Sequence, residues 1–359
     1  MRRKSRPERN DKNPVVDKRP QKTSRNTLQK TLQFESVLLD RNHVSLLKKQ
    51  QYFFIGNHSA VKICEWTRKS LRGENFCYKQ QFYGIRSHMC CQLSVTVSFC
   101  QNKCVFCWRD MAYTSGTSME DLDQGMVDSA EEIIERSVIA QRKLLEGYAG
   151  YDKHDTKKLK ESREPMHYAI SLTGEGTLYP HLAELILGLH KRGKTTFLVS
   201  NGLYPERFEE LEKKGALPTQ LYISLDAPNK RQFEEIDNPQ VPDAWEKLSN
   251  TMRLLRKFRD KTRTALRITA IKGLNMDDID GYAKIIRDAD PLFVEIKSYM
   301  WVGSSRERLR IENMPRHEET REFSERIGKA CGYKIIDEKK ESRVVLLAKD
   351  DFPGRIMEF

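Results

Sequence analysis

Three cysteines on one short stretch, Cys100, Cys104 and Cys107, have the spacing C-x3-C-x2-C. Three thiolates so placed can hold a cubane iron–sulfur cluster and leave its fourth iron without a protein ligand, whereas an electron-transfer cluster normally takes four cysteines. An open iron can coordinate a small molecule. Zinc sites usually take four Cys or His ligands in paired groups, and no second pair follows here. The stretch therefore favours a reactive cluster over a zinc knuckle or structural cysteines.

A second set of cysteines precedes this stretch. Seven of the eight cysteines lie between Cys64 and Cys107, and Cys64, Cys77 and Cys90 are thirteen residues apart. A small secreted domain would spread its cysteines as a disulfide framework, whereas crowding in one segment of a long chain indicates metal. The three cysteines can hold a second iron–sulfur cluster, although such wide gaps also arise by chance. Cys91 is an adjacent alternative to Cys90.

The composition favours a polyanionic partner. The chain has 359 residues, 32% of them charged, and a net charge of +12. Such an excess suits nucleic acid, although a merely soluble basic protein shows it too. No apolar run reaches the roughly 18–20 residues that span a bilayer, and the N-terminus lacks the apolar core of a signal peptide. We therefore expect no membrane contact and a cytoplasmic, reducing location.

Apolar, β-rich runs alternate with helix-like stretches from about residue 92 onward. Near-continuous apolar runs of this kind predict parallel strands buried on both faces, and a βα series closes into a full or partial barrel. We predict an α/β fold, a partial (βα)6 TIM-like barrel with N-terminal and C-terminal extensions, whose first strand leads into the cluster loop. The predicted strands are 92–97, 167–172, 195–199, 220–225, 265–271 and 293–296, and the predicted helices are 129–148, 180–191, 205–214, 245–259, 276–289 and 318–330.

The chain divides into four predicted segments. Residues 1–40 form a disordered basic tail, 41–91 an extension that carries the second cysteine set, 92–332 the barrel, and 333–359 a C-terminal extension. Within them, residues 46–54 predict a helix or strand, and the charge-rich stretch 151–164 predicts an exposed loop. Residues 333–347 predict two short strands around a charged turn.

The cysteine loop resembles that of the radical S-adenosylmethionine (SAM) superfamily, whose clusters cleave SAM reductively. Polar residues follow the predicted strands, where the active sites of such barrels lie. Gly174 lets a ligand approach the backbone, and the resemblance implies that Glu175 accepts hydrogen bonds from the SAM ammonium group. The remaining candidate SAM contacts are Ser200, Asn201, Ser224 and Asp226.

Longer segments resemble one branch of that superfamily, the archaeal-type tRNA 4-demethylwyosine synthases of the wyosine pathway. The likeness runs from about Leu46 to Asp337 and is highly specific, because long runs match as well as spaced cysteines. Those runs are 54–64, 66–67, 70–73, 77–79, 82–85, 87–88, 104–109, 171–180, 198–203, 221–228, 267–275 and 295–309.

The resemblance implies two [4Fe–4S] clusters, with Cys100, Cys104 and Cys107 on the SAM cluster and Cys64, Cys77 and Cys90 on the other. It implies a synthase of the carbon–carbon lyase class that joins two carbons of pyruvate to N1-methylguanosine, next to the anticodon of tRNA(Phe). A radical derived from SAM would take hydrogen from the N1-methyl group, and the resulting carbon radical would attack the pyruvate carbonyl. The second cluster would bind pyruvate at its own open iron.

Lys79 is the candidate catalytic residue, because the family's lysine lies two residues after its middle cysteine. A lysine in low-dielectric surroundings has a lowered pKa and can form a Schiff base with pyruvate. A surface lysine or an RNA contact is the plainer interpretation.

The chain departs from the family pattern in three places. Gly176 replaces the family's proline after the Gly-Glu pair, and the basic tail is longer than expected. The flavodoxin-like module of the eukaryotic form is absent. We therefore expect a separate electron donor of flavodoxin or ferredoxin type, and a monomer.

The RNA contacts are less sharply indicated. Basic side chains can hold phosphates and tryptophans can stack on bases, although core packing is the commoner fate of a tryptophan. The candidates are Arg68, Lys69, Arg72, Arg306, Arg308, Arg310, Trp66, Trp108 and Trp301. Another radical SAM enzyme acting on RNA and a zinc RNA-binding protein are the alternatives.

Overall fold

A single mixed sheet carries all the strands of the described chain. We describe the protein from a computed structural model, which covers residue 36, residues 38–148, residue 150 and residues 154–359. The strand order is β1-β2-β3-β4-β5-β6-β7-β8-β10-β9. The bounds are β1 Phe53–Phe54, β2 Ala60–Lys62, β3 Cys90–Ser94, β4 His167–Ile170, β5 Thr195–Ser200, β6 Gln220–Ser224, β7 Arg263–Ala270, β8 Phe293–Ser298, β9 Lys334–Lys339 and β10 Val344–Ala348.

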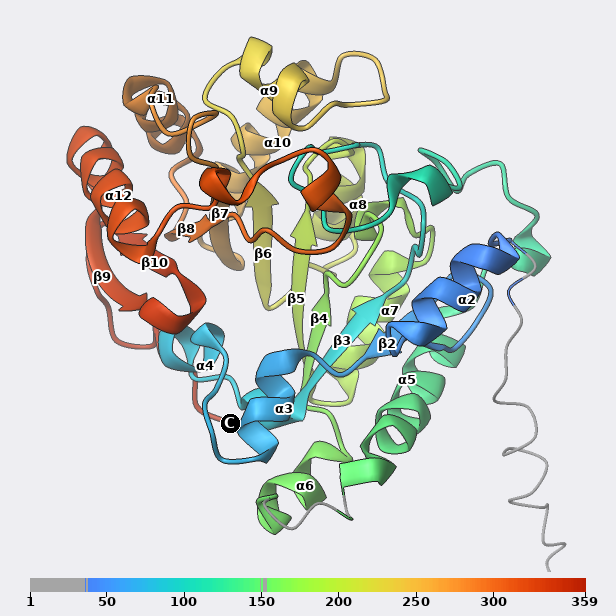
Figure 1. Cartoon of the computed structure of the whole chain (residues 1–359). Coiled ribbons are helices and arrows are strands. Elements are labelled where there is room, and N and C mark those ends of the chain that lie inside the picture. The colour runs from blue at the N-terminus through green and yellow to red at the C-terminus, as the bar shows by residue number, and fades with distance from the viewer. Residues whose placement is uncertain (1–35, 37, 149, 151–153) are drawn as a thin grey trace, which may run out of the picture. The chain divides into compact units, whose positions relative to one another are not determined.

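The strands β3 to β8 run parallel to one another, and a helix follows each of them along the chain. This arrangement confirms the predicted series of βα units, and Figure 1 shows the parallel strands side by side with helices outside them. These helices are α5 Ala130–Leu145, α7 Leu182–Lys191, α8 Pro205–Lys213, α9 Lys230–Ile236, α10 Ala244–Phe258, α11 Ile279–Ala289 and α12 His317–Cys331.

The barrel does not close. β3 pairs with β2 instead of β8, and β8 pairs with β10, both antiparallel. The remaining helices, α2 (Arg41–Lys49), α3 (Glu65–Leu71), α4 (Tyr78–Tyr83) and α6 (Thr156–Ser162), precede β3 or β4 in the chain. The fold is therefore the partial barrel that the sequence predicts.

Helix α4 packs into the barrel itself. Its fully buried Phe82 and Tyr83 belong to the same apolar cluster as Phe197, Tyr222 and Phe293, from β5, β6 and β8. A larger cluster lies between the other face of the sheet and the outer helices, and it includes Leu198, Leu221, Leu266 and Val294 together with residues of α7, α10 and α11. Residues that alternate along each strand therefore face opposite cores.

The structure corrects three details of the sequence prediction. The stretch 151–164 is not a loop throughout, because α6 occupies Thr156–Ser162; Asp155 accepts a hydrogen bond from the Lys158 amide at 3.0 Å, and Leu159 and Ser162 are buried. The stretch 46–54 contains both a helix end and a strand, since α2 ends at Lys49 and β1 follows. The first parallel strand begins at Cys90, two residues earlier than predicted, and ends at Ser94.

The C-terminal prediction is confirmed, because β9 and β10 form an antiparallel pair around the turn at Lys340–Ser342. Most of the predicted basic tail lies outside the described residues. The boundary placed between residues 91 and 92 falls inside β3, and all the segment boundaries remain predictions. No helix in the described ranges has the length and apolar character needed to cross a membrane.

Candidate active site

The cluster loop lies over the carboxyl ends of the parallel strands, held by backbone bonds to distant segments. The Cys100 amide donates to Gly116 O at 3.0 Å, and the Val105 amide donates to Ile236 O at 2.8 Å. Arg308 also donates to the carbonyls of Val105 and Cys107. The Arg308 guanidinium is therefore already hydrogen-bonded to the cluster loop, so it is a poor candidate for binding a phosphate.

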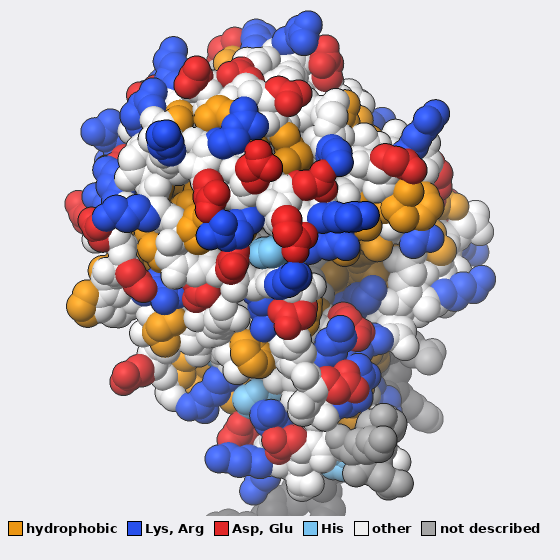
Figure 2. Space-filling view, turned by 60° about the vertical axis from the view of Figure 1, so that its left-hand side comes forward, with side chains coloured by type: hydrophobic (Ala, Val, Ile, Leu, Met, Phe, Trp, Pro, Cys, Tyr) orange, Lys and Arg blue, Asp and Glu red, His pale blue; other side chains and the backbone are white. Residues whose placement is uncertain are grey.

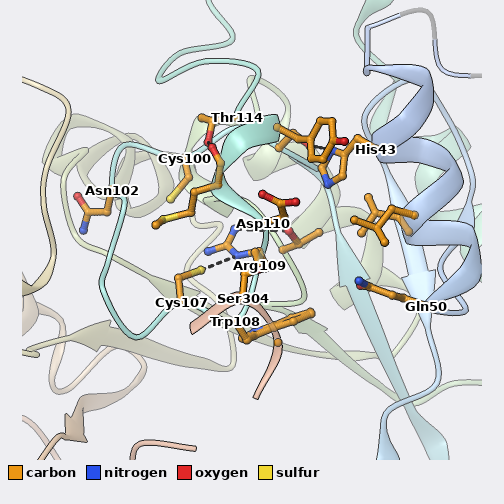
Figure 3. Close-up of a pocket in the computed structure, with 17 residues that line it drawn as sticks. His43, Gln50, Cys100, Asn102, Cys107, Trp108, Arg109, Asp110, Thr114 and Ser304 are labelled. Atoms are coloured by element: carbon orange, nitrogen blue, oxygen red, sulfur yellow. Dashed lines mark hydrogen bonds between the residues drawn. The ribbon is translucent and has the colours of Figure 1, made fainter. Parts of the chain in front are cut away.

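The three cysteines of this loop line one cavity of about 400 Å³. Arg109 points back at them: its Nε lies 3.2 Å from Cys107 Sγ, and its Nη1 donates to Thr173 Oγ1 at 3.4 Å. Figure 3 shows the first of these contacts as a dashed line, with Cys100 nearby. The cysteine charges raise the pKa of Arg109, so the side chain is a permanent cation beside the sulfur atoms.

No three His, Cys, Asp or Glu side chains among the described residues converge on one point as a single metal ion requires. A cubane cluster separates its ligands more widely than a single ion does, so the donor set fits a cluster. Asp237, which the sequence analysis missed, lies beside Cys104, with its Oδ1 3.6 Å from Cys104 Sγ. Its Oδ2 is buried and has no hydrogen-bond partner among the described residues. Burial raises the pKa of Asp237.

All six predicted SAM contacts line this cavity. Gly174 has φ +77°, and a Cβ there would stand 1.7 Å from Thr96 O. The buried Glu175 carboxylate accepts from Thr177 N at 3.1 Å, from Thr177 Oγ1 at 2.8 Å and from Asn201 N at 2.8 Å. Two oxygens offer about four acceptor sites, so Glu175 has room for one further donor.

The other strand ends present polar atoms to the same space. Asn201 Oδ1 accepts from Leu203 N at 3.0 Å, while its Nδ2 is buried without a hydrogen-bond partner in the described chain. Asp226 Oδ1 accepts from Thr269 N at 2.7 Å, and burial raises the pKa of Asp226 to about 6. A buried amide donor without an acceptor is costly, so these residues fit a polar ligand such as SAM.

The second set of cysteines gathers at the open side of the barrel. Cys64 caps α3 and its Sγ accepts from Thr67 N at 3.3 Å, Cys77 caps α4, and Cys90 begins β3. Burial raises the pKa of Cys90, and the nearby Cys64 and Cys77 raise it further. Cys91 is on the opposite face of β3, fully buried in the outer apolar cluster. The structure therefore brings Cys64, Cys77 and Cys90 together and leaves Cys91 out.

Lys79 lies inside the barrel next to this set. Its side chain is 9% exposed, and Nζ lies 4.1 Å from the Tyr222 ring centroid and 5.2 Å from that of Phe197. It has no hydrogen bond or ion pair with another described residue. Burial lowers the pKa of Lys79, against the opposing charge of Glu295. Lys79 is thus a buried amine, which excludes the surface-lysine interpretation.

Three more charged residues of the barrel interior escaped the sequence analysis. Arg267 on β7 and Lys297 on β8 line the cavity, and Glu295 is fully buried between them and α4. Burial and the charge of Arg267 lower the pKa of Lys297 to about 8. The sequence does mark these residues, because each is a charged residue within an apolar run or directly after one.

Comparison with known proteins shows the family to which this chain belongs. A model of the radical SAM superfamily matches residues 94–286, and one of wyosine base formation matches residues 288–349. A tRNA 4-demethylwyosine synthase of Pyrococcus abyssi is 50% identical over 86% of this chain and 88% of its own length. That of Methanocaldococcus jannaschii is 41% identical over 85% and 95%. The chain belongs to the S-adenosyl-L-methionine-dependent tRNA 4-demethylwyosine synthases.

Solved structures of the family agree with the fold. A structure of TYW1 with a lysine–pyruvate adduct bound has a TM-score of 0.78 and 38% identity, over 89% of this chain and 100% of that one. A crystal structure of archaeal TYW1 has a TM-score of 0.70 and 35% identity, over 87% and 96%. As a member of the radical SAM superfamily, the protein uses SAM and a [4Fe–4S] cluster.

The turn at Gly174 gives a direct test of the SAM site. Gly174→Ala would force a Cβ into Thr96 O and displace the Glu175 turn, so we expect SAM affinity to fall about tenfold or more. Isothermal titration of SAM into the reconstituted protein measures this change. Gly273→Ala is the matched control, because Gly273 has φ +79° but nothing within 4 Å of the added Cβ. Equal losses in the two variants would mean that backbone strain alone, and not the contact with Thr96, weakens binding.

Proposed function

We propose that this synthase joins two carbons of pyruvate to N1-methylguanosine of tRNA(Phe), next to the anticodon, to form the tricyclic base 4-demethylwyosine. The observation that carries the proposal is the buried Lys79 amine beside a second set of three cysteines, inside the barrel whose mouth holds the SAM site. The relative of 38% identity described with a lysine–pyruvate adduct supports the same assignment. The reaction belongs to the carbon–carbon lyase class.

The proposed roles belong to residues at two depths of the barrel interior. Glu175, Asn201 and Asp226 hold SAM at the strand ends, and the cluster with SAM supplies the radical chemistry that removes hydrogen from the N1-methyl group. Below them, the Lys79 amine adds to the pyruvate ketone and water leaves, so that a C=N bond forms. The substrate's methylene radical would then bond to that carbon, and the bond to the carboxylate carbon would break, so that this carbon leaves as the CO2 radical anion with the unpaired electron. The exocyclic amine of the guanine would replace Lys79 in the C=N bond, which closes the third ring and frees the lysine. The buried walls exclude water from both depths.

Cys64, Cys77 and Cys90 are proposed to hold the second [4Fe–4S] cluster. Three cysteines would leave one iron open, and that iron would be available to bind pyruvate, since Lys79 lies two residues after Cys77. A separate electron donor of flavodoxin or ferredoxin type, a monomeric state and a cytoplasmic location complete the proposal.

The tRNA side is proposed to centre on Trp108. This side chain is 37% exposed, and it borders both the cluster cavity and an open groove lined by Lys49, Lys62 and Arg68. Lys62 Nζ lies 5.8 Å from its ring centroid. Trp301 is less suited, because its Nε1 donates to Leu309 O at 2.9 Å and Arg306 covers its ring. An exposed aromatic ring among cations is the usual platform for an unstacked base.

The positive charge is distributed unevenly along the chain. Residues 1–35 contain 11 Lys or Arg and 4 Asp or Glu, so they supply more than half of the net +12. On the face that includes α12, blue and red side chains are interspersed without a single basic patch (Figure 2). The groove at Trp108 is therefore a more specific candidate for tRNA contact than the surface as a whole.

The decisive experiment analyses nucleosides by mass spectrometry. N1-methylguanosine-bearing tRNA is incubated anaerobically with the reconstituted enzyme, SAM, pyruvate and a strong reductant, and we expect the tricyclic nucleoside to form. Omitting pyruvate should abolish it. Cleavage of SAM without any tricyclic product would instead favour another radical SAM reaction on RNA.

Iron content tests the second cluster. Reconstituted wild-type protein should carry about eight irons per chain, and Cys90→Ala, with one ligand removed, should fall towards about four. Cys91→Ala is the matched control, one residue along the same strand but in the apolar core. It should keep the wild-type content. The same loss in both variants, or four irons in the wild type, would contradict the assignment.

Borohydride trapping tests Lys79. Reduction in the presence of labelled pyruvate should attach the label to wild-type protein, and Lys79→Ala should lose it because no amine remains to form the C=N bond. Lys297→Met should retain it. Label that survives in Lys79→Ala but is lost in Lys297→Met would move the role to Lys297, the other buried lysine of the cavity.

Trp108→Ala tests the RNA platform. Removal of the ring should raise the tRNA concentration for half-maximal product about tenfold, since stacking of a base on an aromatic ring is worth roughly 1–3 kcal/mol. Pyruvate trapping on Lys79 should be unchanged. Trp245→Ala, on the outer helix α10, serves as the control. An unchanged tRNA requirement in Trp108→Ala would place the base elsewhere.

A further inference from the structure

Arg267 occupies a defined layer of the barrel interior. Its neighbours along β7, Leu266 and Ile268, belong to the outer apolar cluster, so Arg267 faces inward. In the sheet register it lies opposite Ser224 of β6 and Glu295 of β8. Tyr222, under the Lys79 amine, is one inward-facing position below Ser224. Arg267 therefore lies level with Ser224, one of the six SAM candidates, and one inward-facing position above Tyr222, whose ring the Lys79 amine contacts.

The guanidinium of Arg267 has no acceptor among the described residues. No hydrogen bond or ion pair links it to them. Glu295 is the nearest carboxylate along the sheet, but its Oε2 accepts from the Tyr78 hydroxyl at 3.0 Å and its Oε1 from the Tyr83 hydroxyl at 2.6 Å. Arg267 nevertheless lines the cavity. A half-buried guanidinium that lines a cavity keeps its donors for a ligand, and a planar anion is the ligand that matches them.

Among the charged side chains around Arg267, the basic groups outnumber the carboxylates. Arg267, Lys79 and Lys297 supply three basic groups, and two carboxylates are close to Arg267. Glu295 is occupied by two tyrosines, and Asp226 Oδ1 accepts from the Thr269 amide. Lys297 already donates to Ser342 O, and the Lys79 amine faces an aromatic ring. Arg267 and Lys79 therefore both keep their donors free among the described residues, and Arg267 is the one of the two with a planar guanidinium. Its fork matches a carboxylate bidentately.

We infer that Arg267 binds the carboxylate of pyruvate while Lys79 engages the adjacent ketone carbon. The inference rests on the proposed function of Lys79. In a 2-keto acid the two groups are directly bonded, so their binding partners have to be neighbours, as Arg267 and Lys79 are. The methionyl carboxylate of SAM is the other anion of the site, and Ser224, one of the SAM candidates, lies opposite Arg267. Pyruvate is favoured because Arg267 lies one inward-facing position above Tyr222, whose ring the Lys79 amine contacts. Arg267 would hold the carbon that the reaction discards.

The test compares two ketones that differ in charge. Borohydride trapping on Lys79 is measured as a function of the concentration of pyruvate or of its uncharged methyl ester, without tRNA or SAM. In the wild type, the ratio of the half-saturating concentrations of pyruvate and of the ester measures how strongly the site prefers the charged ketone. Arg267→Met should raise the half-saturating concentration of pyruvate about tenfold or more. The half-saturating concentration of the ester should be nearly unchanged, so the ratio shifts by the same factor. Arg267→Lys should give an intermediate shift, since it keeps the charge without the fork.

Each alternative has its own result. Arg256→Met, an exposed arginine on α10, should leave both concentrations unchanged. If Arg267→Met weakens trapping of both ketones equally, Arg267 only supports the fold, and the inference fails. It fails also if pyruvate trapping is unchanged, as when the open iron alone holds the carboxylate, or if only SAM binding weakens.

The two proposals can fail separately. If wild-type protein traps neither ketone, the role of Lys79 is wrong and the inference falls with it. If wild-type protein traps pyruvate and Arg267→Met traps it with the same concentration dependence, Lys79 keeps its role and only Arg267 is misassigned. Should Arg267→Met fail to fold, the ratio measured in Arg267→Lys decides, because retention of the wild-type ratio there contradicts a bidentate contact.

Discussion

The Glu295 carboxylate is the interaction on which the interior of this barrel depends. It lies in the middle of β8, fully buried, and accepts the hydroxyls of Tyr78 and Tyr83 from α4 at 3.0 and 2.6 Å. A buried carboxylate without such donors would be severely destabilising. The two hydrogen bonds therefore fix a short helix inside an open barrel. Because Cys77 and Lys79 lie at the start of that helix, the same bonds place a thiol and an amine in the interior.

This arrangement lines the barrel interior with polar groups at successive depths. Glu175, Asn201 and Asp226 lie at the strand ends beside the cluster loop. Lys297 is level with Thr269, Arg267 lies one inward-facing position deeper, and Lys79 contacts the Tyr222 ring below it. The barrel can hold these groups because it is not closed: β3 pairs with β2 and β8 with β10. Cys64, Cys77 and Cys90 occupy the open side. In a closed barrel, layers of side chains would fill the same space.

The sequence predicted the strands because the apolar runs are long, and it predicted the cluster loop because the cysteine spacing is specific. It did not single out Arg267, Glu295 and Lys297, because Arg267 and Glu295 lie within predicted apolar strands and Lys297 directly follows one. Inside a barrel such residues face the cavity, so the alternation that marks them becomes informative once the fold is known. The strands β1 and β2 escaped for another reason: two and three residues are too few to show a period.

Cys90 and Cys91 show how backbone geometry decides what two identical side chains do. In β3 the outward positions are Cys91 and Leu93, both fully buried in the outer apolar cluster, while Cys90 faces the interior next to Cys64 and Cys77. The register pairs Cys90 with His167 and Cys91 with Tyr168. A slip of one residue would exchange the two thiols, and it would also turn Leu93 away from the core. The hydrophobic effect that sets the register of β3 therefore also selects which cysteine faces the interior beside Cys64 and Cys77.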